Sequence, residues 1–190
     1  MRIVAGEWRG RTLVAPPGTS TRPTADRVRQ ALFDMLMHAE WGGRAAIEGA
    51  AVLDVFAGTG AMGLEALSRG AASACFIEND PAALNALRAN VATLKAGDRA
   101  TVLAMDALAV PPVPPPSAGR PASLIFLDPP YGQTLISPAI ARLLGVGRIV
   151  PGALVVAETE RDETWLPREP LLAERRYGAA RMLIFRLGPV

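Results

Sequence analysis

The sequence predicts an α/β protein with a doubly wound, mainly parallel sheet, an antiparallel C-terminal hairpin, and a small N-terminal extension of β-ribbon and helix. Three observations support this fold class. Short apolar runs alternate with helix-length amphipathic stretches after residue 45, a glycine-rich turn follows the first of these runs, and the chain ends in two strand-like runs around a Tyr-Gly turn. Strands that alternate with helices form a parallel sheet because each connecting helix packs back on it.

The N-terminal extension is expected to span residues 1–45. Alternating residues with two glycines predict a β-ribbon over residues 2–15, and apolar spacing predicts a helix within residues 21–38 that Thr24 can cap. Residues 40–50 read as a linker, so we expect a second domain over residues 46–190.

In that second domain we expect seven strands and three helices. The strands are expected at residues 51–56, 73–78, 100–106, 123–128 and 152–160, with two more within 169–187; the helices are expected at 61–70, 79–97 and 134–145. Asp80 or Asn79 precedes Pro81, which suits the first turn of a helix. The proline-rich residues 111–121 predict a stiff loop.

Composition excludes several classes of protein. No apolar run approaches the roughly 18–20 residues that span a bilayer, and residues 1–13 have no signal-peptide core, so we expect a cytoplasmic protein with no membrane contact. One histidine and one cysteine argue against a zinc site, and we expect no metal cofactor. Cys75 reads as a buried thiol of a strand. Nothing in the sequence requires more than a monomer.

Basic residues gather near the N-terminus. Residues 1–30 contain Arg2, Arg9, Arg11, Arg22, Arg27 and Arg29 but only two acids, Glu7 and Asp26. A basic arm on a nearly neutral chain suits a polyanionic partner, although a solvated basic surface is an equal alternative on charge alone.

The glycine turn follows the first predicted strand of the second domain. Gly58, Gly60 and Gly63 form the pattern G-x-G-x-x-G between a strand and a helix, where the backbone must turn tightly and approach a ligand. With Glu78 at the end of the next strand, this first suggests a dinucleotide site of an NAD-dependent oxidoreductase. The sequence offers no hydride-transfer acid or base, however, and Asp54 before the turn would repel a pyrophosphate.

S-adenosylmethionine (SAM) is the competing cofactor, and three acids favour it. Asp54 can hold an ammonium group through water, Glu78 can accept from ribose hydroxyls, and Asp106 can accept from an adenine amino group. All three lie near the ends of successive strands, at the edge where doubly wound folds bind ligands. Each could instead be a turn former.

The stretch Asp128-Pro129-Pro130-Tyr131 ends the fourth of these strands, at the same edge. It can be a simple strand terminator. It can also activate an exocyclic amine of a nucleobase, because the Asp128 carboxylate and the Pro129 carbonyl can accept from the N–H groups and direct the nitrogen lone pair toward a methyl donor. Pro130 fixes the backbone, and Tyr131 offers a ring on which an extruded base can stack.

These motifs together resemble a known family. The order "DVFAGTG", "IEND", "MDA" and "LDPPYG" resembles class I SAM-dependent amino-methyltransferases. "RIVAGEWRGRTL", "RPTADRVRQALFDML" and "RRYG" are similar to the bacterial 16S rRNA guanine-N2 methyltransferase family, over nearly the whole chain. The resemblance implies a Rossmann-like seven-stranded methyltransferase sheet, with 16S rRNA, the small ribosomal subunit or its assembly intermediate as partner. The reaction would leave S-adenosylhomocysteine.

The resemblance also assigns residues. Asp128, Pro129, Pro130 and Tyr131 would hold the target guanine, and the segment Arg22-Pro23-Thr24 would contact RNA beside the cofactor pocket. The residues implied for SAM are Asp54, Phe56, Ala57, Gly58, Thr59, Gly60, Glu78, Asn79, Asp106 and Ala107. Those implied for RNA are Arg2, Arg9, Arg11, Arg22, Thr24 and Arg27.

Two alternatives share part of this pattern. A DNA adenine-N6 methyltransferase has the same catalytic motif, and only the N-terminal arm favours RNA and guanine. A non-catalytic ribosome-assembly factor could bind RNA on the same fold, but it would have no need of Asp128 to Tyr131.

Overall fold

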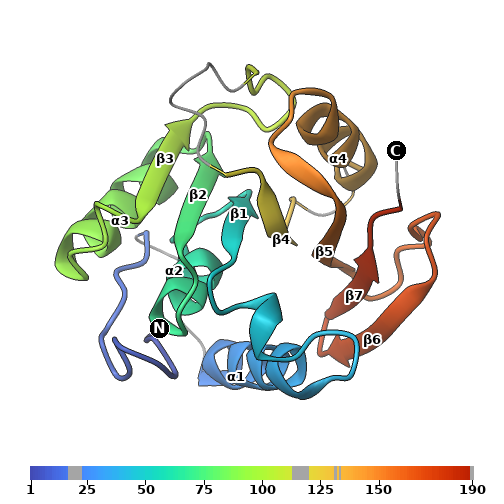
Figure 1. The fold of residues 1–190 in the computed structure, drawn as a ribbon. Helices are drawn as coiled ribbons and strands as arrows, with labels where there is room; N and C mark the ends of the chain where they lie inside the picture. Colours follow the sequence, from blue (N-terminus) through green and yellow to red (C-terminus); the bar gives the residue numbers. More distant parts are fainter. Residues whose placement is uncertain (17–22, 113–119, 131, 133, 189–190) are drawn as a thin grey trace.

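A single seven-stranded sheet organises the protein (Figure 1). The computed structural model describes residues 1–16, 23–112, 120–130, 132 and 134–188. The strand order is β3-β2-β1-β4-β5-β7-β6, in which β1 to β5 run parallel and β7 joins β5 and β6 antiparallel. The doubly wound sheet with an antiparallel C-terminal hairpin is therefore confirmed.

The elements fall close to their predicted positions. The strands are β1 Ala51–Val55, β2 Ser73–Glu78, β3 Ala100–Ala104, β4 Ala122–Leu127, β5 Ile149–Glu160, β6 Leu171–Tyr177 and β7 Ala180–Arg186. The helices are α1 Pro23–His38, a short 3-10 turn at Arg44–Ala46, α2 Ala61–Ser68, α3 Pro81–Thr93 and α4 Ile136–Gly145. Asp80 caps α3 by accepting from the Ala83 N–H at 2.8 Å.

Two helix ends differ from expectation. The helix α1 begins at Pro23, so Thr24 lies inside its first turn rather than before it as a cap. The helix α3 ends at Thr93, a few residues before the predicted Ala96-Gly97. Lys95 has a positive φ of 52°, which α-helical backbone excludes, and this explains the earlier end.

The two faces of the sheet are covered by different helices. Side chains alternate across a strand, so Val52, Phe126 and Val156 pack in one buried cluster with α1, α2 and α3. Leu53, Leu127 and other odd-numbered residues pack on the opposite face with α4. Because the strands β1, β4 and β5 are apolar on both faces, the layered arrangement follows directly from their sequence.

The N-terminal segment forms less of a ribbon than predicted. Only a single antiparallel bridge joins Arg2 to Thr12. The N–H groups of Val4 and Ala5 instead donate to the Glu65 carboxylate of α2, at 2.8 and 3.1 Å. Backbone hydrogen bonds between residues 1–3 and 10–13, such as the one from the Ile3 N–H to the Arg11 carbonyl at 2.9 Å, form a short ladder, and contacts with α2 hold residues 4 and 5 beyond it. The domain boundary near residue 45 stays a prediction.

None of the helices in the described residues is both long and apolar enough to cross a membrane.

Candidate active site

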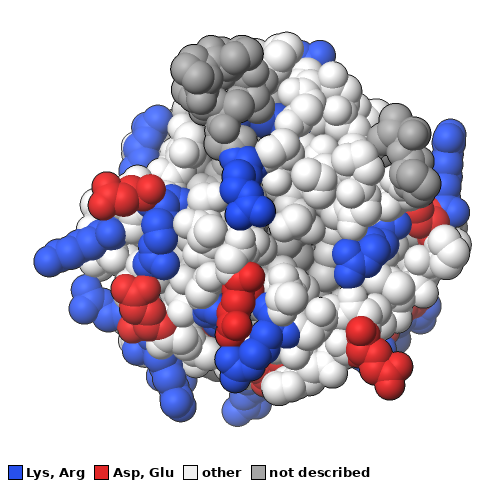
Figure 2. All heavy atoms as spheres, viewed as in Figure 1, with Lys and Arg blue, Asp and Glu red and all other residues white. Residues whose placement is uncertain are grey.

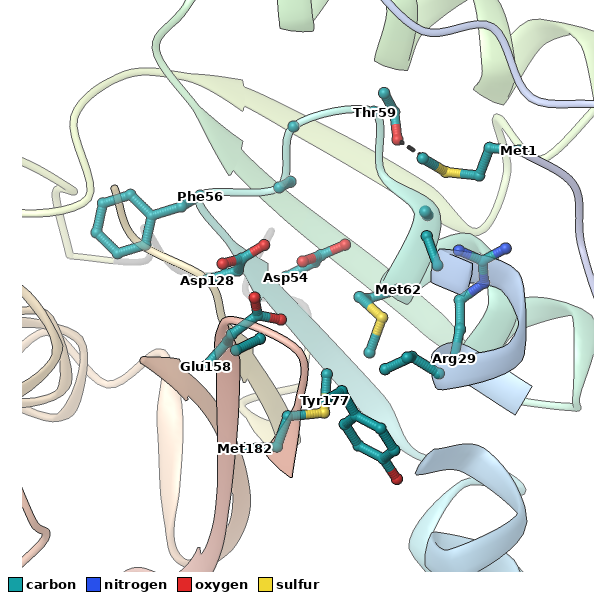
Figure 3. A pocket seen from close by; sticks show the side chains of 16 residues that line it. Met1, Arg29, Asp54, Phe56, Thr59, Met62, Asp128, Glu158, Tyr177 and Met182 are labelled. Atoms are coloured by element: carbon teal, nitrogen blue, oxygen red, sulfur yellow. Dashed lines mark hydrogen bonds between the residues drawn. The ribbon is translucent and has the colours of Figure 1, made fainter. Parts of the chain in front are cut away.

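A pocket of about 390 Å³ opens at the carboxyl end of β1, β4 and β5 (Figure 3). The glycine turn forms one wall, α1 forms another, and the hairpin of β6 and β7 closes the side opposite the turn. The lining residues are Met1, Ala25, Val28, Arg29, Asp54, Phe56, Ala57, Gly58, Thr59, Ala61, Met62, Asp128, Glu158, Tyr177, Ala180 and Met182. The predicted turn and the predicted catalytic acid therefore face one cavity.

The glycines of the turn serve different purposes. Gly58 has a φ of +55° and a Cβ there would meet nothing within 4 Å, so this residue is needed for the backbone conformation. A Cβ at Gly60 would lie 2.3 Å from Leu87 Cδ1, and one at Gly63 would lie 2.4 Å from the Phe76 ring. These two glycines permit close packing inside the protein. The close approach of their backbone to a ligand stays a prediction.

Asp54 anchors the start of α2 from beneath the turn. Its Oδ2 atom accepts from the Gly63 N–H at 2.8 Å, where the positive end of the helix dipole favours an anion. Burial nevertheless raises the pKa of Asp54 to about 8; the Gly63 N–H opposes this shift, while the charges of Asp128 and Glu78 add to it. The pocket therefore contains a carboxyl that a cationic ligand would stabilise in its ionised form.

Asp128 lies beside Glu158 on the next strand. Burial of the carboxyl in the pocket wall, followed by repulsion from Glu158, raises the pKa of Asp128 to about 7. The pocket wall surrounds the carboxyl group, but the Asp128 residue keeps an exposed surface, so water screens part of this repulsion. Figure 3 shows the carboxyl groups of Asp54, Asp128 and Glu158 gathered at the pocket floor.

Glu78 supports the glycine turn from the second strand. Its carboxylate accepts from the Gly58 N–H at 2.7 Å and from the Asn79 and Asp80 N–H groups at 2.8 Å each. It therefore links the turn after β1 to the segment that leads from β2 into α3. Glu78 does not line the pocket itself, and its role with a ribose stays a prediction.

The other residues that are predicted to bind SAM but do not line the pocket are Gly60, Asn79, Asp106 and Ala107. Asp106 accepts from the Leu108 N–H at 2.8 Å, which is the turn-forming role of a strand-end acid. Asn79 is exposed and Ala107 is buried. Gly60 lies within the turn but does not line the cavity. The assignments of Asn79, Asp106 and Ala107 to SAM stay predictions.

The motif after β4 is described in part. The Asp128 N–H donates to the Val55 carbonyl at 3.4 Å, which continues the pairing of β4 with β1. Pro129 is buried and Pro130 is exposed. The predicted stacking residue Tyr131 lies outside the described residues, as do residues 113–119 of the proline-rich loop.

The sequence did not predict that Glu158 and Arg29 line the pocket. Glu158 belongs to β5, and its place at the carboxyl end of a strand is the same signal that identified Asp54 and Asp128. Arg29 is buried, donates to the Arg2 carbonyl and to Asp26, and lies 3.6 Å from the Glu65 carboxylate. It is therefore a structural ion-pair partner rather than part of an exposed basic arm.

The other arginines of the arm are exposed. Arg2, Arg9, Arg11 and Arg27 lie on the surface, and Arg11 donates to the Thr93 carbonyl at 3.2 Å. Figure 2 shows basic side chains over the region of the N-terminal segment and α3, with acidic side chains among them. Arg22 lies outside the described residues, and so does the side chain of Thr24. The RNA contacts of all six stay predictions.

Two further features concern metal-ligating residues and the one cysteine, which lies outside the pocket lining. Within the part of the chain that the structure describes, no three or more His, Cys, Asp or Glu residues form a group that could hold a metal ion. Cys75 is half-buried in β2, and desolvation raises the pKa of its thiol to about 11, a shift that Arg148 opposes. A protonated thiol is a poor nucleophile.

Comparison with known proteins identifies the family. The family described as Conserved hypothetical protein 95 matches residues 1–186. The chain belongs to this family. It is 42% identical over 172 residues to "Ribosomal RNA small subunit methyltransferase D" of Escherichia coli K12, a match that covers 90% of this chain and 79% of the relative. The protein of the same name from Haemophilus influenzae is 37% identical over 181 residues, covering 94% and 89%. Membership of this methyltransferase family confirms the resemblance in the motifs.

Solved structures agree on the fold. The structure of yhhF from Escherichia coli has a TM-score of 0.79 and 38% identity, covering 100% of this chain and 99% of the other. An RNA methyltransferase from Salinibacter ruber, solved in complex with S-adenosylhomocysteine, has a TM-score of 0.61 at 15% identity, covering 90% and 95%. The fold is therefore that of class I methyltransferases.

Proposed function

We propose that this member of a ribosomal RNA methyltransferase family transfers a methyl group from SAM to the exocyclic N2 of a guanine in 16S rRNA. The observation that carries the proposal is the single pocket into which the glycine turn and Asp128 both face. A methyl acceptor held by Asp128 would then lie beside a donor held by the turn, and such alignment supplies much of the rate of a displacement reaction.

The residues present fit SAM. When bound, SAM supplies a methyl group on a positively charged sulfonium, and its amino group is also cationic. The carboxyls of Asp54 and Asp128 have raised pKa values, which a cationic ligand would lower. The turn residues Phe56 to Thr59 would hold the ligand over Asp54, and Met62 and Val28 supply apolar walls. An anionic pyrophosphate would instead raise the pKa of Asp54 further and gain no attraction from it, which disfavours NAD.

Asp128 would act on the acceptor amine. An exocyclic amine of guanine is a weak nucleophile because its lone pair is delocalised into the ring. Hydrogen bonds from its N–H groups to the Asp128 carboxylate and the Pro129 carbonyl would localise that lone pair toward the methyl donor. The amine loses its extra proton after transfer, and Asp128 is placed to receive it. Tyr131 would stack on the extruded base.

The N-terminal segment would hold the RNA. Arg2, Arg9, Arg11, Arg22, Thr24 and Arg27 would contact phosphates of 16S rRNA in the small subunit or its assembly intermediate. Residues 1–45 would thus form the RNA-binding extension and residues 46–190 the methyltransferase domain. A ribosomal substrate implies a cytoplasmic location, and a monomer suffices for each role.

Transfer of label from radioactive SAM tests this proposal. The protein is incubated with naked 16S rRNA, with small subunits that lack the modification, and with duplex DNA. We expect label in one or both ribosomal substrates. Label in DNA alone would favour the adenine-N6 alternative, and label in none would favour a non-catalytic assembly factor; either result overturns the proposal.

A further inference from the structure

We propose that Glu158 is a specificity-determining residue that accepts a hydrogen bond from N1–H of the target guanine, while Asp128 accepts from the adjacent N2 amine. This inference rests on the proposed function and identifies the residue that would distinguish guanine from adenine. The stretch Asp128-Pro129-Pro130-Tyr131 does not make that distinction, and the N-terminal arm favours guanine only through the family resemblance.

The position of Glu158 follows from the register of the sheet. Leu127 of β4 lies opposite Ala157 of β5, so Asp128 and Glu158 occupy the next position on neighbouring parallel strands. Such strands lie about 4.8 Å apart. Phe126 and Val156 pack on the face covered by α1, α2 and α3, and the alternation of side chains puts Asp128 and Glu158 on that same face.

The backbone holds Glu158 firmly. It pairs with Met182 of β7 on one side, while β5 pairs with β4 on the other. A side chain on a central strand is placed more precisely than one on a loop. Figure 3 shows its carboxyl group directed into the pocket next to that of Asp128.

Burial is the main reason that the pKa of Asp128 is raised, and repulsion between the adjacent Asp128 and Glu158 carboxylates adds to it. Such a pair is useful where a ligand presents adjacent donors. The Watson–Crick edge of guanine has this character, because N1–H lies next to the N2 amine. Two carboxylates supply four acceptor oxygens for these N–H groups. Adenine presents a bare N1 acceptor beside its amine, so one carboxylate would face a lone pair.

The order of the strands gives the orientation of the base. The glycine turn follows β1, and β4 and β5 lie successively farther from it. An amine near the methyl donor would therefore contact Asp128 first, and N1 would lie toward Glu158. This order matches the order of the two nitrogen atoms along the guanine edge.

Base analogues at the methylated position test the inference. The RNA is made with guanosine or with 2,6-diaminopurine riboside at the guanine that the parent protein labels. Both bases carry the N2 amine, but diaminopurine lacks N1–H. We expect the parent to prefer guanosine by at least about 10-fold in kcat/KM, since a good paired contact to a base edge discriminates by roughly that much.

The variant Glu158→Gln should reduce this preference by at least about 10-fold, because its amide can donate to the bare N1 as well as accept from N1–H. Glu160→Gln is the matched control. Glu160 is exposed on the same strand outside the pocket, and its variant should keep the parent's preference. Unchanged SAM binding in both variants shows that the fold is intact.

The outcomes separate this inference from the proposed function. Equal losses on the two bases in Glu158→Gln would indicate a structural role and overturn the inference alone. A parent that uses guanosine and diaminopurine equally well would overturn it whatever the variants do. If the parent protein labels no guanine, both the proposed function and this inference are overturned.

Discussion

At the scale of single residues, the pocket contains two carboxyl groups, those of Asp54 and Asp128, whose burial opposes their ionisation. Asp54 is the clearest example, since it is buried beneath the glycine turn and its pKa rises to about 8. A folded-state pKa above the unfolded value means that the folded protein binds the proton more tightly. Its contribution to stability is therefore greatest below the unfolded pKa, about 4, and is lost as the pH rises toward 8.

We expect Asp54→Asn to weaken this pH dependence. The amide keeps an oxygen that can accept from the Gly63 N–H, but it has no charge to desolvate. At pH 8 the ligand-free variant should melt about 2–4 °C above the parent, corresponding to roughly 1 kcal/mol. At pH 5 the difference should shrink. Thermal melts across this pH range, without SAM, measure it; parallel curves for both proteins would refute the assigned pKa.

Some residue roles follow from sequence and others do not. The placement of Asp54 and Asp128 at one edge follows from strand ends and parallel topology, and it is confirmed. The burial of Arg29 could not be predicted, because a charged residue is expected on the surface and its partner Glu65 in α2 is distant in the chain. The packing roles of Gly60 and Gly63 depend on Leu87 and Phe76, which are distant in the chain.

At the scale of elements, α2 connects the N-terminal segment to the pocket. Glu65 is fully buried in this helix, where its carboxylate accepts from Val4, Ala5 and Arg69 and lies 3.6 Å from Arg29. Arg29 lines the pocket and donates to the Arg2 carbonyl. The ribbon is shorter than predicted because the N–H groups of Val4 and Ala5 donate to the Glu65 carboxylate instead of to a partner strand.

We expect Glu65→Gln to destabilise the protein strongly. The substitution removes the fully buried carboxylate that Arg29 and Arg69 share and leaves them only the more exposed Asp26 and Asp34, and breaking a buried ion pair typically costs about 3–5 kcal/mol. The N-terminal segment should also become sensitive to limited proteolysis between residues 4 and 16. Unfolding in urea measures the first effect, and mass spectrometry of the fragments measures the second.

Glu48→Gln is the control for this change. Glu48 pairs with Arg44 at 2.7 Å with the same i,i+4 spacing as Glu65 and Arg69, but both side chains of the Arg44–Glu48 pair are exposed. Its loss should cost no more than about 1 kcal/mol. Similar losses in both variants would show that the buried network does not anchor the segment.

At the scale of the whole molecule, the fold brings together the pocket at the edge of the sheet and the arginine-rich N-terminal segment. The alternation of strands and helices predicted the sheet, because the handedness and shortness of the connections leave few possible arrangements of parallel strands. The N-terminal ribbon was less predictable, since its contacts with α2 are made between residues about 60 positions apart.

The basic segment makes a prediction about salt. If Arg9 and Arg11 contact phosphates, the double variant Arg9→Gln/Arg11→Gln should bind 16S rRNA more weakly. The slope of log affinity against log salt should also fall in magnitude by about 1–2. Arg120→Gln/Arg168→Gln removes the same charge from exposed residues elsewhere and should leave the slope unchanged. Equal slopes for the two double variants and the parent would contradict the role of the segment.

The most direct test of the central claim is the identity of the methylated nucleoside. Small subunits that lack the modification are incubated with labelled SAM and either the parent protein or Asp128→Asn, and the RNA is digested to nucleosides. We expect the parent to place label in N2-methylguanosine, and the variant to bind SAM but transfer at least about 100-fold more slowly. Label in a different nucleoside, or undiminished transfer by the variant, would contradict the account.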